Sequence, residues 1–526
     1  MRFPLLLCLL LLTRLGLSQT PRADVLIRNG RLYDGTGNAW TTGDVAIRDG
    51  RIIAVGHLSA DYPAETVLDA KGLAVAPGFI DVHTHIEDDE VQQPTADNFL
   101  YDGVTTVVTG NCGSSRPGLG QYFRMLDSLH LSVNVASFVG HGTVRKAVMG
   151  RAKRAPTEAE LQQMEVLVAQ AMQAGAVGLS SGLIYVPGTY SRPPEMVRLA
   201  RVAAQYHGLY ATHMRNESDS VTFAIQEALQ VAREAGLPLE ISHLKIGGQQ
   251  NWGQADKLLA LIEQARQAGQ QVTIDQYPYT ASSTSLSTLL PDDVQADGRD
   301  SLRVRLQRPK VRAAVEADML RRLKRRGLKH FSYAVVASFP PEPSYQGLSI
   351  EEINRRRKRP HNARAEVTTI LELVLQHDAG MVFHGMSEPD VQQIMRYPQN
   401  MVASDASIRV WQQGMPHPRG YGSNARVLGH YVRELRVLTL EDAIRRMTSL
   451  PAQTMGFPDR GLLRLGYAAD IVVFDPATVQ DRSTFTQPHQ YSTGMKYVLV
   501  NGRLTVLDGK HTGLRNGHVL YGAGKK

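Results

Sequence analysis

The sequence predicts an α/β protein: a (β/α)8 TIM-type barrel, a small β-sandwich domain formed by both chain ends, and a lid inserted into the barrel. Three observations lead to this prediction. Apolar, β-branched runs alternate with helical patterns eight times across residues 76–457, which is typical of a parallel barrel. Short strands with tight turns occupy residues 19–75 and 458–526 instead. A basic segment, residues 285–365, interrupts the alternation between the seventh and eighth runs.

The two chain ends share one pattern of short alternating strands. It occurs in "ADVLIRNGRLYDG" and "GDVAIRDGRIIAVG" near the N-terminus, and in "ADIVVFDP" and "KYVLVNGRLTVLDGK" near the C-terminus. Asn or Asp followed by Gly is a strong signal for a two-residue hairpin turn. We therefore expect hairpins at Asn29-Gly30, Asp49-Gly50, Asn501-Gly502 and Asp508-Gly509. Strands from both ends would then close one small sandwich.

Between the chain ends, eight apolar runs are candidate barrel strands. They are "AVAPGFIDVH", "GVTTVVTG", "LSVNVASFVG", "AVGLSSG", "GLYATH", "PLEISH", "QVTIDQY" and "NMVASD". Helical patterns fill the gaps, as in residues 157–175 and 220–236, and several of them end in glycine. A ninth run, "GMVFHGMS" at residues 380–387, is expected outside the barrel.

The positive charge of the chain is concentrated in one segment. The net charge is +8, yet residues 299–364 contain 18 Lys/Arg and 6 Asp/Glu, so the rest of the chain is acidic overall. A solvated helical insertion is the favoured interpretation, and attraction to acidic substrates or an anionic surface is the alternative. Specific nucleic-acid binding is disfavoured because no aromatic side chains alternate with the basic ones. Its place between the last two strands puts the insertion over the barrel mouth, where it would act as a lid.

The first residues resemble a secretory leader. A basic start, a leucine-rich core and the small residues Gly16 and Ser18 predict a signal peptide at residues 1–18, cleaved after Ser18, with a retained short anchor as the alternative. We therefore expect an exported protein, periplasmic or secreted. Its apolar core is too short to span a bilayer, and no later segment is apolar enough, so stable membrane insertion after cleavage is not expected. Removing the leader removes Cys8 and leaves Cys112 as the single thiol.

The ends of five candidate strands supply six groups that can bind a metal or transfer a proton. The groups are His83, His85, Cys112, His213, His243 and Asp405. In a barrel the carboxyl ends of the strands converge on one mouth, so these side chains should meet there. Neutral imidazoles together with one thiolate favour Zn²⁺. Taken singly, a strand-end histidine or a buried cysteine has a structural interpretation as well.

Several motifs resemble a known family. "APGFIDVHTH" and "GYAADIVVFDP" resemble the opening and closing signatures of the amidohydrolase superfamily. "TGNCGSS", "THMR", "SHLK", "QYPYTASST", "SDAS" and "HPRGYG" are similar to those of its D-aminoacylases, the N-acyl-D-amino-acid deacylases. The similarity runs from about residue 23 to residue 518.

The resemblance implies a role for each motif. Cys112, His213 and His243 would hold one tightly bound zinc ion, and His83 and His85 a weaker second site that shares Cys112 and Asp405. Asp405 would be the general base and acid. The groups that bind the substrate carboxylate would be Lys245, Arg419, Tyr185 and Tyr277, with Ser283 beside them in the same motif.

The implied reaction is zinc-dependent hydrolysis of a small molecule, an N-acyl-D-amino acid, to a carboxylate and a free D-amino acid. A dipeptidase acting on D-amino-acid-containing dipeptides and a cyclic-amide hydrolase are alternatives within the superfamily. A non-catalytic binding protein on the same scaffold is a remote one. Since a cyclic amide has no free α-carboxylate, it would not need both Lys245 and Arg419.

Two departures from the family pattern touch the site. Ile86 follows the HxH pair where the family often has an acidic residue, and Ala406 follows Asp405 where the family often has glycine. Neither departure removes a metal-binding group. His141, Tyr190 and Trp252 are further candidates for the pocket wall, with structural roles equally open.

Overall fold

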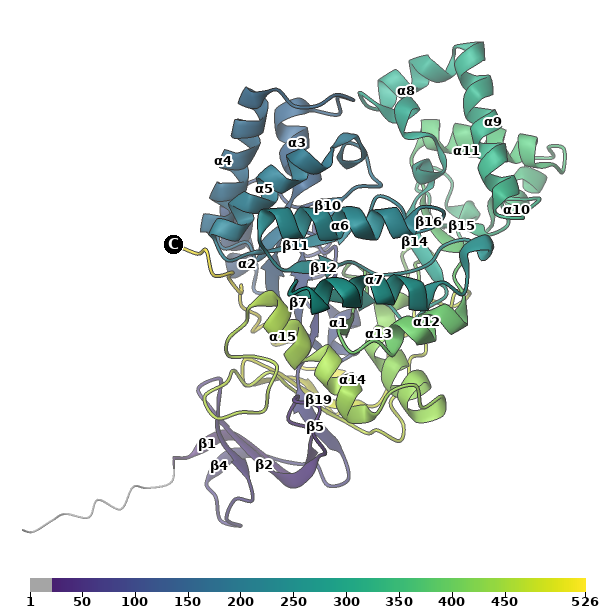
Figure 1. Cartoon of the computed structure of the whole chain (residues 1–526). Helices are drawn as coiled ribbons and strands as arrows, with labels where there is room; N and C mark the ends of the chain where they lie inside the picture. The colour runs from purple at the N-terminus through teal and green to yellow at the C-terminus, as the bar shows by residue number, and fades with distance from the viewer. Residues whose placement is uncertain (1–20) are drawn as a thin grey trace, which may run out of the picture.

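The computed structural model describes residues 21–526, and the expected leader at residues 1–18 lies outside them. Figure 1 shows helices packed around parallel strands in the centre, and a second group of strands, from the chain ends, below them. A helical unit inserted late in the chain projects at the upper right. No helix within residues 21–526 has the length and apolar character needed to cross a bilayer.

The central strands form two parallel sheets. The three-stranded sheet consists of β6 (Phe79–Asp81), β7 (Val104–Thr109) and β8 (Asn134–Ser137). The six-stranded sheet runs in the order β17 (Asn400–Val402), β13 (Val272–Gln276), β12 (Leu239–Ile241), β11 (Leu209–His213), β10 (Gly178–Gly182) and β9 (Val139–Gly140). Each predicted run contributes a strand, and the third run is divided between β8 and β9. The α/β class is therefore confirmed.

Single contacts connect the two parallel sheets. Thr84 forms an isolated parallel bridge with Ala406. The N–H of Val177 donates to the carbonyl of Ser137 at 3.0 Å. A continuous ladder around a closed ring, as expected for a barrel, is not formed by the strands of residues 21–526.

The two helices expected from their amphipathic pattern are present with the expected ends. In α4 (Glu158–Ala174), the hydroxyl of Thr157 and the carboxylate of Glu160 form a capping box, and Gly175 ends the helix at φ 111°. Helix α6 (Val221–Ala235) ends at Gly236 in the same left-handed region. The other helices that accompany the parallel strands are α1 (Asp97–Leu100), α2 (Leu119–Leu129), α3 (His141–Met149), α5 (Pro193–Gln205), α7 (Ala255–Gln267), α12 (Glu388–Met395), α13 (Arg419–Arg426), α14 (Leu440–Met447) and α15 (Ser449–Met455).

The chain ends form one nine-stranded sheet. Its N-terminal strands are β1 (Ala23–Leu32), β2 (Thr41–Arg48), β3 (Arg51–Gly56), β4 (Ala64–Asp69) and β5 (Ala74–Pro77). Its C-terminal strands are β18 (Ile471–Phe474), β19 (Met495–Val500), β20 (Arg503–Leu507) and β21 (Lys510–His511). The two ends of the chain meet where β5 pairs with β18 in antiparallel register. The strand pairing joins all nine strands in one sheet. It does not show the two separate layers that the expected sandwich would have.

Three of the four predicted hairpin turns are present, and one is wrong. Asp49-Gly50 joins β2 to β3, Asn501-Gly502 joins β19 to β20, and Asp508-Gly509 joins β20 to β21. Asn29-Gly30 instead lies inside β1, where the register against β2 shifts. Asn29 adopts φ 61°, and the carboxylate of Asp44 accepts its N–H at 2.9 Å, so the dipeptide forms a bulge.

The inserted unit, residues 281–384, has its own sheet and core. Its strands β14 (Ala281–Ser285), β15 (Ala334–Ser338) and β16 (Gly380–His384) are antiparallel, with β16 in the middle. Its helices are α8 (Arg299–Leu306), α9 (Pro309–Arg325), α10 (Ile350–Arg356) and α11 (Ala363–Gln376). The side chains of Met319, Ile370 and Met381 belong to a hydrophobic cluster confined to this unit. The ninth apolar run therefore lies outside the parallel sheets, as predicted.

Many basic side chains of the inserted unit are paired at its surface. Arg322 contacts Asp318 at 2.6 Å, and Arg357 and Arg359 contact Glu372 at 2.9 and 2.8 Å. Such partly exposed pairs are typical of solvated helices. They favour the interpretation of this segment as a solvated helical insertion.

Candidate active site

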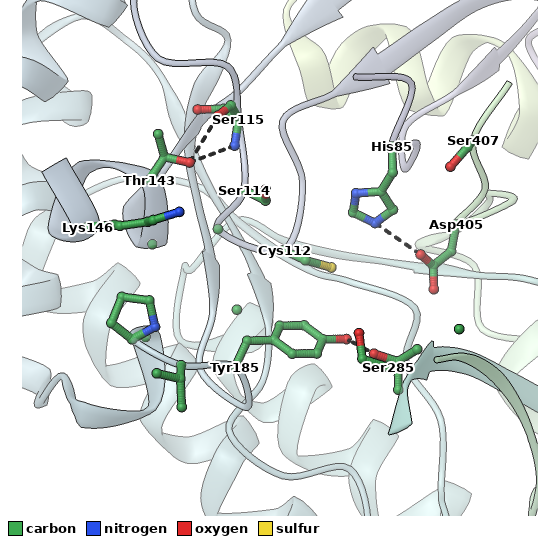
Figure 2. Close-up of a pocket in the computed structure, with 18 of the residues that line it drawn as sticks. His85, Cys112, Ser114, Ser115, Thr143, Lys146, Tyr185, Ser285, Asp405 and Ser407 are labelled. Atoms are coloured by element: carbon green, nitrogen blue, oxygen red, sulfur yellow. Dashed lines mark hydrogen bonds and ion pairs between the residues drawn. The ribbon is translucent and has the colours of Figure 1, made fainter. Parts of the chain in front are cut away.

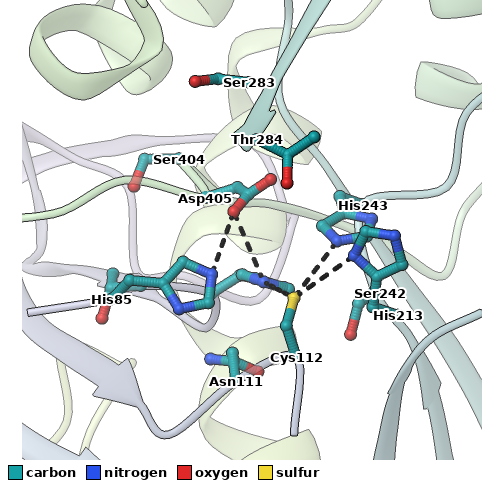
Figure 3. Close-up of polar contacts among 12 residues, drawn as sticks. His85, Asn111, Cys112, His213, Ser242, His243, Ser283, Thr284, Ser404 and Asp405 are labelled. Atoms are coloured by element: carbon teal, nitrogen blue, oxygen red, sulfur yellow. Dashed lines mark hydrogen bonds and ion pairs between the residues drawn. The ribbon is translucent and has the colours of Figure 1, made fainter. Parts of the chain in front are cut away.

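Cys112 lies at the centre of a cluster of histidines (Figure 3). Its Sγ is 3.3 Å from His83 Nε2, 3.5 Å from His213 Nδ1 and 3.5 Å from His243 Nε2. His83, His213 and His243 are buried, and Cys112 is partly buried. The structure thus brings together residues that are 160 positions apart in the chain.

These side chains are brought together by the carboxyl ends of the parallel strands. His83 and His85 follow β6, Cys112 follows β7, His213 ends β11, His243 follows β12, and Asp405 follows β17. At Cys112, His243 and Asp405 the backbone takes positive φ values of 52°, 36° and 50°. A non-glycine residue is strained in this region, and such strain is retained where it positions functional side chains. Here it turns the chain sharply just after each strand.

The spacing in the cluster matches a tetrahedral zinc site. With Zn–S near 2.3 Å and Zn–N near 2.0–2.1 Å, a sulfur and a nitrogen ligand at a tetrahedral angle are about 3.6 Å apart. Both Sγ–N distances to His213 and His243 are 3.5 Å. The three ligand atoms of Cys112, His213 and His243 lie within 4.8 Å of one another, as do those of His83, His85 and Cys112. The donor set therefore fits a metal ion, with Cys112 common to two overlapping groups.

The protonation states at this site also favour a cation. Burial raises the pKa of the Cys112 thiol well above its usual value, and the nearby Asp405 carboxylate adds to this effect. Burial lowers the pKa of His213 and of His243 well below the usual value, so both imidazoles are neutral at neutral pH. A divalent cation would stabilise the thiolate and use the lone pairs of the imidazoles.

Asp405 lies between the histidines and a guanidinium. Its Oδ1 is 3.2 Å from His85 Nε2 and 3.7 Å from His83 Nε2, and its Oδ2 is 2.8 Å from Arg419 Nη1. Burial opposes ionisation, but the charge of Arg419, together with the hydrogen bond from His85, outweighs it and holds the pKa of Asp405 well below its usual range. Asp405 is therefore an ionised carboxylate beside the cluster.

Two further carboxylates orient the histidines, and the sequence analysis did not identify them. Asp275 Oδ2 is 3.1 Å from His83 Nδ1, and Asp275 Oδ1 accepts the backbone N–H of His243 at 2.9 Å. Glu217 is 3.0 Å from His243 Nδ1 and 3.4 Å from His213 Nε2. Carboxylates in such positions fix the tautomer and direction of a metal-binding imidazole. Asp275 lies near the end of the seventh predicted run, and Glu217 lies four residues after His213. These positions are the sequence signals by which the two carboxylates could have been found.

The two cations predicted to bind a substrate carboxylate are present at the site, and both contact protein carboxylates. Lys245 Nζ forms an ion pair with Glu217 and lies 2.7 Å from His243 Nδ1. Arg419 pairs with Asp405 and lies with its Cζ 4.5 Å from the ring centre of Tyr277. Buried Arg419 Nε has no hydrogen-bond partner within residues 21–526, so one donor of the guanidinium remains free.

The site opens into two adjoining cavities. The larger, of about 870 Å³, is lined by His85, Cys112 and Asp405 among others (Figure 2). The smaller, of about 150 Å³, is lined by His213 and Lys245 among others. Shared walls come from Tyr185, Ser283, Thr284 and Asp405. The hydroxyl of Thr284 donates to that of Tyr185 at 3.1 Å, and the carbonyl of Ser283 accepts from Arg419 at 3.3 Å.

The other candidate pocket residues have structural contacts. His141 is buried and bonded to Glu195 at 2.9 Å. The hydroxyl of Tyr190 donates to a backbone carbonyl at 2.7 Å, and Trp252 Nε1 does so at 3.2 Å. These three described side chains do not line either cavity of the site.

A second group of possible ligands lies in the inserted unit. It consists of His330, Glu351 and His361. The two imidazole rings are stacked, with centroids 4.4 Å apart and an angle of 15° between planes. An imidazole lone pair lies in the plane of its ring, so the lone pairs of two stacked rings lie in parallel planes and do not converge on one ion. The geometry of this group therefore differs from that of the Cys112 cluster, and it does not favour a metal site.

Replacement of Cys112 by alanine tests the metal site. The variant removes the sulfur shared by both ligand groups, so we expect it to lose tightly bound metal while its circular dichroism spectrum stays that of the native fold. Metal content of purified protein, measured by mass spectrometry, is the readout. Ser114→Ala, in the same loop, is the matched control and should keep its metal. A full metal complement in Cys112→Ala would contradict the assignment.

Comparisons with known proteins agree with this geometry. The amidohydrolase family model matches residues 66–506. D-aminoacylase from Alcaligenes xylosoxydans xylosoxydans is 35% identical over 520 residues, covering 94% of this chain and 97% of that protein. N-acyl-D-glutamate deacylase from the same organism is 38% identical over 503 residues, covering 91% and 93%. The crystal structure of N-acyl-D-glutamate deacylase from Bordetella bronchiseptica, complexed with zinc and a phosphonate inhibitor, gives a TM-score of 0.81 at 37% identity, covering 95% of this chain and 100% of that one.

The matched region includes every residue of the metal cluster and both cavities. With one family model over most of its length, and relatives above 30% identity over more than nine-tenths of it, the chain belongs to the amidohydrolase family, in the group of D-aminoacylase and N-acyl-D-glutamate deacylase.

Proposed function

We propose that the protein hydrolyses the amide bond of N-acyl-D-amino acids in a metal-dependent reaction, giving a carboxylate and a free D-amino acid. The observation that carries this proposal is the set of Cys112, His213 and His243, with ionised Asp405 beside it. The relatives named D-aminoacylase and N-acyl-D-glutamate deacylase support the reaction class.

The metal is zinc, held tightly by Cys112, His213 and His243. Support comes from the donor types, since one thiolate with neutral imidazoles suits zinc, and from the Sγ–N distances. His83 and His85 form a weaker second site that shares Cys112 and Asp405. Its weakness follows from exposure, because the side chain of His85 is 31% exposed.

The metal would polarise the amide carbonyl and lower the pKa of a water molecule at the site. Asp405 accepts the proton of the attacking water and later donates it to the leaving amine. His85 contacts Oδ1 of Asp405 and Arg419 contacts Oδ2. These two contacts keep the carboxylate in one orientation through both proton transfers. Burial around Asp405 strengthens these interactions by excluding bulk water.

The α-carboxylate of the substrate binds between Lys245 and Arg419, against Tyr185, Tyr277 and Ser283. Both cations keep donors for it despite their protein partners. An ammonium has three N–H groups, and Glu217 accepts from Lys245, which leaves N–H groups for the substrate. Arg419 has a free Nε. The fixed positions of the cations relative to the metal select the D-enantiomer.

The two parallel sheets make one (β/α)8 barrel at residues 76–457, and the inserted segment 285–365 is its lid. The strands follow one another in sequence order, and single contacts such as Thr84–Ala406 join the edges of the two sheets. The inserted segment contributes Ser285 to the wall of the larger cavity and Leu289 and Arg326 to that of the smaller one. Residues 21–75, the described part of the expected segment 19–75, and residues 458–526 form the companion sandwich, with β5 extending to Pro77.

A cyclic-amide hydrolase is the second candidate. It is disfavoured because a cyclic amide presents no free α-carboxylate to the two buried cations Lys245 and Arg419. A dipeptidase shares the α-carboxylate and differs only in the acyl half of its substrate.

Steady-state assays with N-acetyl-D- and N-acetyl-L-amino acids test the reaction and its stereochemistry. We expect the D-enantiomer of an apolar amino acid to be hydrolysed at least about 10²-fold faster, as kcat/KM, because the L-enantiomer cannot satisfy both cations while its carbonyl faces the metal site. Hydantoins should be poor substrates. Equal rates for both enantiomers, or preferred cleavage of a cyclic amide, would contradict the proposal.

Replacement of Asp405 by asparagine tests the proton transfer. The amide is nearly isosteric and keeps an oxygen, so the metal content should stay close to that of the wild type. Because the amide cannot accept and return a proton, we expect kcat to fall by at least about 10³-fold. Asp297→Asn, in the inserted unit, is the control and should leave kcat unchanged. Retention of a tenth of the wild-type kcat would show that another group transfers the proton.

A further inference from the structure

One wall of the larger cavity is positively charged without matching carboxylates. Beyond Cys112, this cavity extends to helix α3 and the loop that follows it, where Lys146 and Arg151 form part of the lining. We call this region, with Gly142 and Thr143, the α3 end. Lys146 and Arg151 form no ion pair within residues 21–526, whereas Lys153, two residues on, pairs with Asp293. Figure 2 shows Lys146 with its amino group directed toward the middle of the cavity.

The rest of the α3 end is polar and made of small residues. Its lining includes Gly113, Ser114 and Gly188, and the apolar atoms come from short side chains such as Val186. The feature that distinguishes this wall is the pair of cations without carboxylate partners, Lys146 and Arg151. Lys146 lies in the last turn of α3, which begins at His141, and Arg151 follows the end of the helix. An anion fits this environment better than an alkyl chain does.

The smaller cavity identifies which half of the substrate faces the α3 end. It contains Lys245, one of the cations for the α-carboxylate, together with the apolar side chains of Leu289, Phe383 and Met386. Arg419, the second of these cations, lines the larger cavity next to the shared wall. Under the proposed function, on which this inference rests, the α-carboxylate therefore lies at the boundary of the two cavities and the side chain of the amino acid enters the smaller one. The carbonyl lies over the metal cluster, and the acyl half then extends into the larger cavity.

We propose that the acyl half of the substrate ends in a carboxylate, which Lys146 and Arg151 bind at the α3 end. The preferred substrates are thus N-acyl-D-amino acids derived from dicarboxylic acids, with succinyl as the simplest example. A dipeptide carries an ammonium group on its acyl half, which two unpaired cations repel, so the dipeptidase alternative is disfavoured by the same charges.

The test compares N-succinyl-D-leucine with N-succinamoyl-D-leucine, whose terminal amide has the same shape without the charge. Hydrogen bonds to charged groups predict a kcat/KM that is about 10–100-fold higher for the succinyl substrate. In the double variant Lys146→Met/Arg151→Gln this ratio should fall close to one, mainly through KM. The control Lys153→Met changes a nearby cation that does not line the cavity and should keep the ratio of the wild type.

Three outcomes would overturn the inference. Equal kcat/KM for the succinyl and succinamoyl substrates in the wild type is the first, and a ratio that survives in the double variant is the second. The third is a preference for a charged substrate that appears only when N-acetyl-D-glutamate is compared with N-acetyl-D-glutamine, and that is lost in Arg326→Gln. Because Arg326 lines the smaller cavity, this result would place the second carboxylate on the amino-acid half of the substrate. In all three the enzyme still hydrolyses N-acyl-D-amino acids, whereas hydrolysis of none of these amides would overturn the proposed function itself.

Discussion

The contact of the Cys112 thiol with three imidazole nitrogens is the constraint around which the site is built. A buried sulfur at 3.3–3.5 Å from three histidines combines groups that gain little from one another without a cation. Burial keeps the thiol protonated and the imidazoles neutral, so the ligands are in place while the stabilising charge has to come from a metal. This explains why an otherwise reactive thiol is positioned between strand ends instead of in the apolar core.

The surrounding carboxylates and cations follow from that constraint. Asp275 and Glu217 orient the histidines, and Glu217 also pairs with Lys245, so the histidine cluster and the Lys245 ammonium share one partner. Asp405 is connected to the opposite side through His85 and Arg419. Binding of a metal cation or of a substrate carboxylate would therefore change the electrostatic interactions of all of these groups. The strained backbone at Cys112, His243 and Asp405 is the local cost of directing the side chains inward.

The sequence was sufficient to predict that the candidate metal-binding groups meet at the strand ends, and insufficient to predict the carboxylates that contact them. Cys112, His213 and Asp405 were predictable because parallel strands alternate with helices, and the carboxyl ends of such strands converge. Asp275 and Glu217 were missed because a carboxylate near a histidine in sequence has many structural explanations, and only the fold shows which nitrogen it contacts. The ion pair of Lys245 with Glu217 escaped for the same reason. At Asn29-Gly30 the sequence signal indicated a positive φ, and Asn29 adopts one, but in a bulge inside β1 and not in a hairpin turn. Ladder closure depends on hydrogen bonds between sheet edges, about which strand patterns carry no information.

X-ray absorption spectroscopy of the zinc-loaded protein tests the central claim, that the thiolate of Cys112 binds the metal together with imidazoles. The account predicts one sulfur scatterer near 2.3 Å and nitrogen scatterers near 2.0–2.1 Å at the tightly bound zinc. In Cys112→Ala, any zinc restored at high concentration should show the nitrogen shell without sulfur. A spectrum of the wild-type protein with only nitrogen and oxygen neighbours would contradict the account, because the thiol of Cys112 would then not bind the metal.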